Sequence, residues 1–132
     1  MAACDLSGAP DDLHRQVDRE TRDWCAGLRG DGVVEGRFLN RVLVDMQHVV
    51  LVELATSEKE RARRLSERLG RATCEREIRQ IDAESDLFQV RMYPGASCAT
   101  GAHRIDTDGG TAQECGQKLI SLISHLRAAE RG

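Results

Sequence analysis

The chain has 132 residues, a formal net charge of −3 at pH 7 and 31% charged residues. This length suits one domain with one core, and the nearly balanced charge argues against a nucleic-acid-binding protein that relies on overall basicity. No apolar run approaches the roughly 20 residues that span a bilayer, and the first fifteen residues lack the basic and apolar regions of a signal peptide. We therefore expect a single cytoplasmic domain, residues 1–132, that binds neither nucleic acid nor a membrane.

Four segments have the period of amphipathic helices. They are expected within residues 8–29, from the capping box Ser57–Glu60 to Gly70, over residues 74–92, and from the capping box Thr111–Glu114 to Leu126. The apolar face of the first consists of Leu13, Val17, Trp24 and Leu28. Each segment is long enough to cover one face of a sheet.

Three segments between the helices predict strands: "GVVEG" (32–36), "VVLVEL" (49–54) and "HRIDTD" (103–108). The second is a near-continuous apolar run, typical of a strand buried on both faces. The alternation of strands with helices predicts an α/β fold with a short, mainly parallel three-stranded sheet and about four helices. Residues 93–104, "PGASCATGAHR" with the tyrosine before it, are expected to form a mobile loop.

The cysteines and histidines give no sign of a metal centre or a disulfide framework. The five cysteines are odd in number and lack a Cys-x-x-Cys spacing, which is typical of a reduced compartment. Cys25, Cys74 and Cys115 fall on predicted apolar helix faces, where a thiol is a small hydrophobic group. The four histidines lack metal-ligand spacing. We expect neither a metal nor a cofactor.

The predicted second helix carries an arginine row. Arg61, Arg64 and Arg68 are three or four residues apart and therefore share one side of the helix. Such a row could bind a phosphate group. The alternative is a solvated face on which these arginines alternate with glutamates.

Four segments, in order, resemble the cytidylate-kinase-like family of P-loop nucleoside monophosphate kinases: "GVVEGRFL", "VVLVELATSEKERARRLSERL", "IRQIDAESD" and "RIDTDGGTAQECGQKLI". The resemblance covers residues 30–123, and its most specific part is the strand that leads into Thr-Ser-x-Glu-x-Arg-Ala-Arg-Arg. In that family the arginine of Glu-Gly-Arg lies at the acceptor-nucleotide pocket, the arginine-rich helix contributes to phosphate binding, and a lid closes over the transferring phosphoryl group. The resemblance implies Arg37, Arg61, Arg64 and Arg91 as ligand- or phosphate-binding residues.

The chain departs from that family on the donor side. It lacks the family's first strand and the loop Gly-x₄-Gly-Lys-Ser/Thr, which cradles phosphates through backbone N–H groups and a lysine. The expected lid, "AESDLFQVRMYPG", keeps only Arg91. Phosphoryl transfer depends on positioned cations, so we do not expect an autonomous ATP-dependent kinase. A missing central strand also leaves exposed edges, which predicts a remodelled sheet, a homodimer or a partner protein.

Other residues allow several interpretations. Glu35 could act as a general base, or it could form a plain ion pair with Arg37. The segment "DTDGG" resembles a calcium loop but lacks its later oxygen ligands, so a strand-to-helix turn is expected there. A Cys98 nucleophile with His103 as its base would need a lowered thiol pKa and a positioned imidazole.

Two functional hypotheses follow. In the first, a degenerate kinase-like domain binds a phosphorylated or nucleotide-like small molecule in the acceptor pocket, with non-kinase chemistry in specialised metabolism. In the second, the chain is a non-catalytic interaction or regulatory protein that acts as a dimer, as a subunit of a larger enzyme, or as half of a split kinase. Whether the chain is an enzyme is left open by the residues alone.

Overall fold

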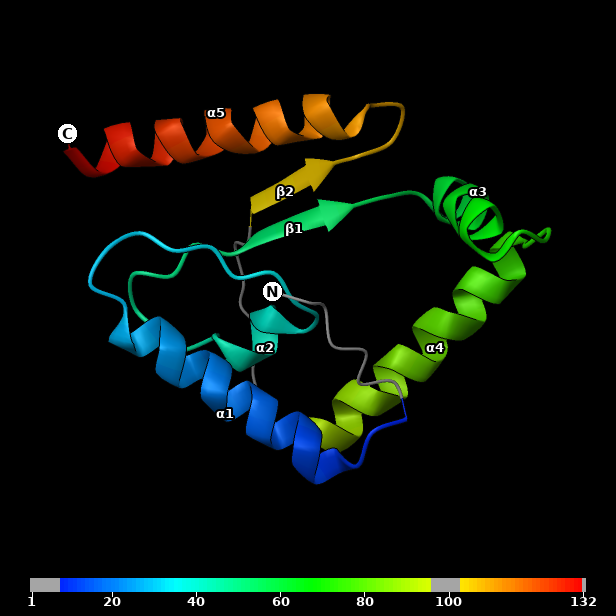
Figure 1. Cartoon of the computed structure of the whole chain (residues 1–132), viewed down its shortest axis with the longest axis horizontal. Coiled ribbons are helices and arrows are strands. Elements are labelled where there is room, and N and C mark those ends of the chain that lie inside the picture. Colours follow the sequence, from blue (N-terminus) through cyan, green and yellow to red (C-terminus); the bar gives the residue numbers. More distant parts are fainter. Residues whose placement is uncertain (1–7, 96–102, 132) are drawn as a thin grey trace. The chain divides into compact units, whose positions relative to one another are not determined.

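A computed structural model describes residues 8–95 and 103–131, and these residues group into two compact units. Unit 1 consists of the described parts of Met1–Val49 and Asp86–Thr100, and unit 2 consists of those of Val50–Ser85 and Gly101–Gly132. Figure 1 labels the elements of both units.

Unit 1 is helical. It contains α1 (Asp11–Gly27), the single turn α2 (Leu39–Val42) and the last residues of α4 (Glu75–Met92). Polar contacts join these segments: Arg22 donates to the backbone oxygen of Val42 at 2.6 Å, and the phenol of Tyr93 donates to Asp18 at 2.7 Å. The buried apolar side chains of this unit are Val42, Leu43 and Met92.

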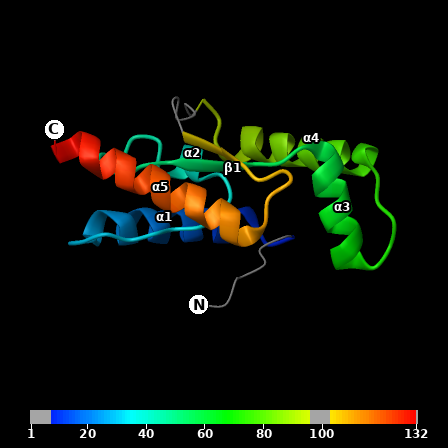
Figure 2. The same ribbon diagram turned by 90° about the horizontal axis from the view of Figure 1, so that it is seen from above.

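Unit 2 is built on two parallel strands, β1 (Val52–Ala55) and β2 (His103–Asp106). Between them the chain forms α3 (Glu58–Leu69) and the start of α4, and Figure 2 shows the turn that joins these helices. After β2 the chain returns as α5 (Ala112–Arg131), which packs beside β2 (Figure 1). The long connection between the strands is what a parallel pair requires.

Both predicted helix starts are confirmed, each with the hydroxyl half of its capping box. The Ser57 hydroxyl accepts the backbone N–H of Glu60 at 3.2 Å at the start of α3, and Thr111 accepts the N–H of Glu114 at 3.1 Å at the start of α5. α3 ends at Gly70, whose φ of +67° is a left-handed conformation that glycine adopts without strain. These caps fix the points at which the chain leaves β1 and β2.

The core of unit 2 is thin. Its buried residues are Ala55, Ala62, Ile78, Ile105 and Thr107, and no described side chain anywhere in the chain is less than 2% exposed. Large apolar side chains remain at the surface; Leu54 in β1 is 64% exposed. A sheet of two strands with so small a core is marginal on its own.

The predicted three-stranded sheet is reduced to two strands among the described residues. The segment "GVVEG" is irregular, because its glycines disfavour a strand and because Gly32 lies against α1. A Cβ on Gly32 would lie 2.7 Å from a methyl carbon of Leu28 and 3.1 Å from the Trp24 ring. The α/β class is thus confirmed in its coarse form, with more helix than expected.

Three smaller expectations are also corrected. The α2 turn was not expected from the sequence. Cys74 precedes α4 and is exposed rather than part of an apolar face. Of the predicted mobile loop 93–104, residues 96–102 lie outside the described residues, whereas His103 and Arg104 belong to β2. Cys98 also lies outside the described residues.

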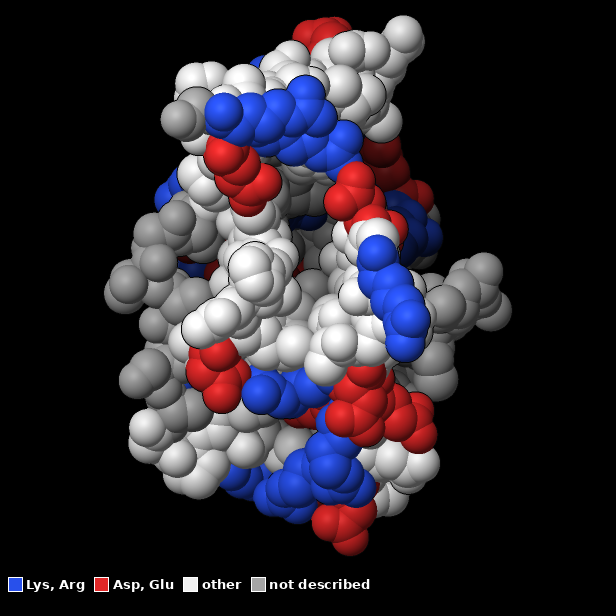
Figure 3. Space-filling model, turned by 90° about the vertical axis from the view of Figure 1, so that its left-hand side faces the viewer, with Lys and Arg blue, Asp and Glu red and all other residues white. Residues whose placement is uncertain are grey.

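Charges are mixed on the surface. On the face drawn in Figure 3, basic and acidic side chains lie interspersed. Among the described helices, none is long and apolar enough to cross a membrane.

Candidate functional site

In unit 2 polar side chains gather where the two parallel strands end. The register pairs Ala55 with Asp106, so the residues that follow each strand are neighbours. The hydroxyls of Thr56 and Thr107 are 2.5 Å apart, and the Ser57 N–H donates to the Asp108 carboxylate at 2.9 Å. Ligands of open α/β sheets bind at this carboxyl edge, so it is the first place to look for a site.

Arg64 is drawn into this cluster. Its Nη2 donates to the backbone oxygen of Thr107 at 2.9 Å, its Nη1 to the Thr107 hydroxyl at 3.2 Å, and its Nε to Glu60 at 3.0 Å. Its guanidinium therefore fastens α3 to the end of β2. Arg64, which the sequence predicts to bind phosphate, is thus hydrogen-bonded to groups of the chain itself.

Arg61, one turn earlier on α3, has a different partner. It forms a bidentate pair with Asp82 of α4, with N–O distances of 2.8 and 2.7 Å. The hydrogen bonds from Arg61 lower the pKa of the Asp82 carboxyl below its usual value. This fork-to-fork geometry is the one in which arginine binds carboxylate or phosphate best, and a carboxylate of the same chain occupies it.

The start of α3 is likewise filled by the chain's own anions. Hydrogen bonds from Ser57 lower the pKa of Asp108, so this carboxylate stays ionised at the helix N-terminus. Hydrogen bonds from Arg63, followed by those from Arg64, lower the pKa of Glu60 to about 2. A phosphate at this helix end would have to displace or approach these carboxylates, which opposes the attraction of the helix dipole.

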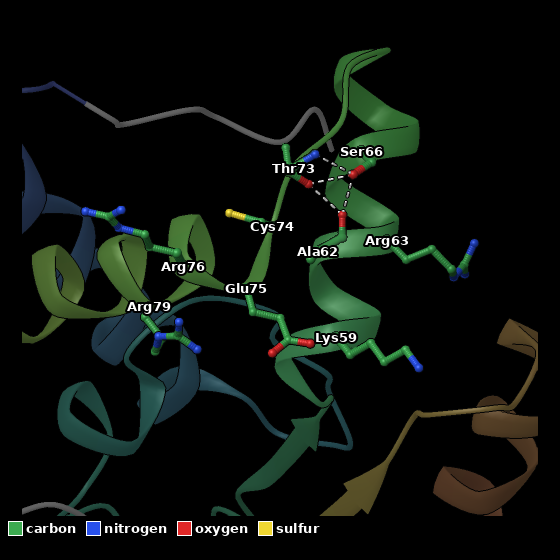
Figure 4. Close-up of a pocket in the computed structure, with 9 residues that line it drawn as sticks. All are labelled: Lys59, Ala62, Arg63, Ser66, Thr73, Cys74, Glu75, Arg76 and Arg79. Carbon is green, nitrogen blue, oxygen red and sulfur yellow. Dashed lines mark hydrogen bonds between the residues drawn. The ribbon is translucent and has the colours of Figure 1, made fainter.

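A hollow of about 580 Å³ lies between α3 and the start of α4 (Figure 4). Its lining residues are Lys59, Ala62, Arg63, Ser66, Thr73, Cys74, Glu75, Arg76 and Arg79. Two of its lining residues join α3 to the turn before α4, because the hydroxyls of Ser66 and Thr73 both donate to the Ala62 carbonyl, at 2.8 and 2.7 Å.

The cations around this hollow spread outward. Figure 4 shows Lys59 and Arg63 extending from one side of α3 and Arg76 extending in the opposite direction from α4. Arg63 is held by Glu60 and Glu67, whereas Lys59 and Arg76 have no polar partner among the described residues. The hollow is thus basic at its rim but does not focus its charges on one point.

In unit 1 the other predicted residues surround two stacked phenylalanines. The Arg37 guanidinium lies 5.1 Å from the centre of the Phe38 ring, and Phe38 stacks on Phe88 at 5.4 Å. Arg91 lies 5.4 Å from the Phe88 ring and forms a bidentate pair with Asp11, both bonds being 3.0 Å.

Arg37 differs from the three other predicted arginines. It is exposed, and within the described part of the chain its guanidinium has no hydrogen bond or ion pair, only the contact with the Phe38 ring. Phe38 itself has a φ of 61°, a left-handed conformation that is unusual for a bulky residue. Glu35 is also exposed, and it forms no ion pair with Arg37 among the described contacts.

The predicted site residues therefore fall into two groups, Arg37 with Glu35 and Arg91 in unit 1, and Arg61 with Arg64 in unit 2. Sequence reasoning did not find Asp82 or Thr107, the partners that occupy the α3 arginines. Nothing in the local sequence marks them, because Asp82 is 21 residues from Arg61 and Thr107 is 43 residues from Arg64.

The segment "DTDGG" forms the predicted strand-to-helix turn. The backbone N–H of Asp108 donates to the Asp106 carboxylate at 2.9 Å, and Gly109 has a φ of +68°. Among the described residues no group of three or more histidine, cysteine, aspartate or glutamate side chains is placed to hold a metal ion.

Comparisons with protein-family models, curated proteins and solved structures find no match to this chain. Its function has to be inferred from its own residues.

Proposed function

We propose that the chain is a non-catalytic interaction protein that assembles, as a dimer or as a subunit of a larger enzyme, through the outer edge of β1. The observation that carries this proposal is the unpaired backbone of that edge. In β2, His103 donates its N–H to Leu51 and Thr107 donates its N–H to Ala55. Backbone groups alternate in direction along a strand, so those of Val52 and Leu54 point away from β2.

No other strand among the described residues pairs with this edge. Two apolar side chains beside it are exposed: Val50 is 52% exposed and Leu54 is 64% exposed. An exposed apolar strand edge is a template for pairing with another chain, and strand addition is a common mode of protein recognition.

The same structure weakens the case for a phosphate pocket on α3. Arg61 and Arg64 have partners within unit 2, and the start of α3 is occupied by carboxylates. A ligand that recruited these arginines would first have to break bidentate or half-buried hydrogen bonds, and that loss would offset part of the binding free energy.

Capture of partner proteins tests the proposal. The immobilised full-length chain is exposed to an extract of cells that produce it, beside the variants Leu54→Pro and Leu87→Lys. Leu54→Pro removes an N–H on the outer edge only, a position at which a strand tolerates proline. Leu87 is 71% exposed on α4 and is the control for loss of a surface leucine. Identified partners, including free copies of the chain, should be lost with Leu54→Pro alone. Equal capture by all three proteins would refute the proposal.

A second function is favoured by Arg37. Of the four predicted arginines it is the exposed one without a carboxylate partner in the described residues, and therefore the one most ready to bind an anion. The alternative proposal is therefore that a degenerate cytidylate-kinase-like domain binds a phosphorylated or nucleotide-like small molecule at Arg37, with Glu35 nearby to orient it or move a proton.

A thermal-shift screen against CMP, CDP, ATP and simple phosphate esters tests this alternative. A ligand that binds only the folded state stabilises it by about 2.7 kcal/mol at a hundredfold excess over its dissociation constant. A shift that disappears in Arg37→Ala, in a variant that retains its unfolding midpoint without ligand, would support it. A flat screen would exclude it for these compounds.

A further inference from the structure

We infer that the occupant of the outer β1 edge is β1 of a second copy of the chain, paired antiparallel about a two-fold axis at Val52. This inference rests on the proposed function and specifies its partner. It concerns β1 of unit 2 and the residues that lead directly into that strand.

The extended segment that can pair has defined ends. His48 has a φ of 64°, a left-handed conformation that interrupts an extended chain, and α3 begins at Glu58 after the Ser57 cap. The residues available on the outer edge therefore run from 49 to 56. A two-fold axis at Val52 pairs residues 49–55 and one at Glu53 pairs residues 50–56, whereas an axis further along in either direction leaves more residues without a partner.

Charge selects between these two registers. An axis at Glu53 would place two glutamates directly opposite each other, and like charges in that position destabilise a sheet. With the axis at Val52, Glu53 lies opposite Leu51 of the second copy. Its nearest charged neighbour across the existing sheet is then Arg104, with which it is paired in the β1–β2 register.

The side chains fit as well. Residues 50, 52 and 54 project to one face of the strand, so the register brings Val50 of each copy against Leu54 of the other. These are the two exposed apolar side chains of the segment, at 52% and 64%. Their mutual burial removes from water the apolar surface that β1 leaves exposed.

The outer edge of β2 is a poorer alternative. Backbone alternation directs the carbonyl of Asp106 to that edge, where Lys118 of α5 donates to it at 3.3 Å. α5 packs beside β2, so this edge is already covered in part. Pairing through β1 instead gives a continuous sheet in the order β2, β1, β1, β2, and sheets of three or more strands are stable where a two-stranded one is marginal.

Light scattering coupled to size-exclusion chromatography tests the inference on the full chain over a hundredfold range of concentration. The wild type is expected to be a dimer, and Leu54→Pro and Leu54→Lys are expected to be monomers with unchanged helix content by far-ultraviolet circular dichroism. Leu87→Lys, which changes an equally exposed leucine elsewhere, should remain dimeric. A monomeric wild type at the highest concentration, or a dimeric Leu54→Pro, would overturn the inference.

A substitution of Glu53 tests the register. With the axis at Val52, Glu53→Gln should change the dimer dissociation constant less than threefold, because no second carboxylate lies opposite. Tightening by tenfold or more would show that the glutamates face each other and that the register is wrong. If the wild type is a monomer and yet loses a captured protein on Leu54→Pro substitution, the proposed function holds and only the second copy as partner is rejected.

Discussion

The polar cluster at the ends of β1 and β2 should stabilise unit 2, and Thr107→Val is the sharpest test. Thr107 is 7% exposed, and its side chain can be replaced by the isosteric valine without a change of volume. The substitution removes the hydroxyl that accepts from Arg64 at 3.2 Å and lies 3.2 Å from the Ala55 carbonyl, where it donates.

The loss is limited because other bonds remain. The Thr107 backbone N–H still donates to Ala55 at 2.8 Å, and Arg64 keeps the Thr107 carbonyl and Glu60. Thr56, however, loses its hydroxyl partner in a half-buried position. The hydroxyl takes part in three hydrogen bonds, so at about 1 kcal/mol for each we expect Thr107→Val to lower the free energy of unfolding by about 3 kcal/mol.

Urea unfolding followed by circular dichroism measures this change, and Thr107→Ser is the matched control. Serine keeps the hydroxyl and removes one methyl group, which costs about 0.8 kcal/mol. Thr107→Val should therefore be the less stable of the two variants. A valine variant as stable as the wild type, or more stable than the serine variant, would refute the view that these hydrogen bonds hold the strand ends together.

Three further predictions concern individual contacts. Gly32→Val should lower the stability of unit 1 by no more than about 0.5 kcal/mol, because its Cβ would meet only the end of the Leu28 side chain at 2.7 Å, and that side chain is 39% exposed and can turn away. Fluorescence of Trp24, the chain's single tryptophan, reports unfolding, and a loss above about 1 kcal/mol would show a tighter contact. Arg61→Met should cost no more than about 1 kcal/mol in a urea titration, because the ion pair with Asp82 is partly exposed; a larger loss would indicate a stronger pair. Glu60 has a pKa lowered from 4.5 to about 2, so the stability that its ionised carboxylate contributes is present above pH 4.5 and is lost as the pH falls toward 2. In Glu60→Gln the acid-induced loss of stability should therefore be smaller. An unchanged acid profile would show that Glu60 is not a source of that loss.

The helices were predictable because their signals are local. A helix cap such as that of Ser57 on the N–H of Glu60 needs only residues three apart, and the structure confirms it. The strand predicted at residues 32–36 is not formed. Its two valines favour a strand locally, but the position of Gly32 is set by its contact with α1. Tertiary packing of this kind overrides strand propensity and leaves no trace in a short window.

The candidate site likewise combines features that the local sequence predicts with contacts that it does not. The sequence placed Arg61 and Arg64 together on one helix, which is correct, but their function depends on which groups face them. Asp82 comes from another helix and Thr107 from the end of β2. The alternating glutamates predict the alternative, a helix face satisfied by ion pairs. The ion pairs of Arg63 with Glu60 and Glu67 follow directly from that spacing.

The parallel register also has a consequence for the order in which the chain acquires structure during synthesis. Ser57 and Asp108, the residues that follow the two strands, are separated by 51 positions, so β1 leaves the ribosome well before β2 exists to pair with it. Contacts this distant in sequence form slowly, because closing the loop between the two strands costs conformational entropy before any hydrogen bond can form. Throughout that interval β1 has two open edges rather than one. The nascent chain is therefore most prone to aggregation before residue 103 emerges, and substitutions on β1 should affect its soluble yield more than its final stability.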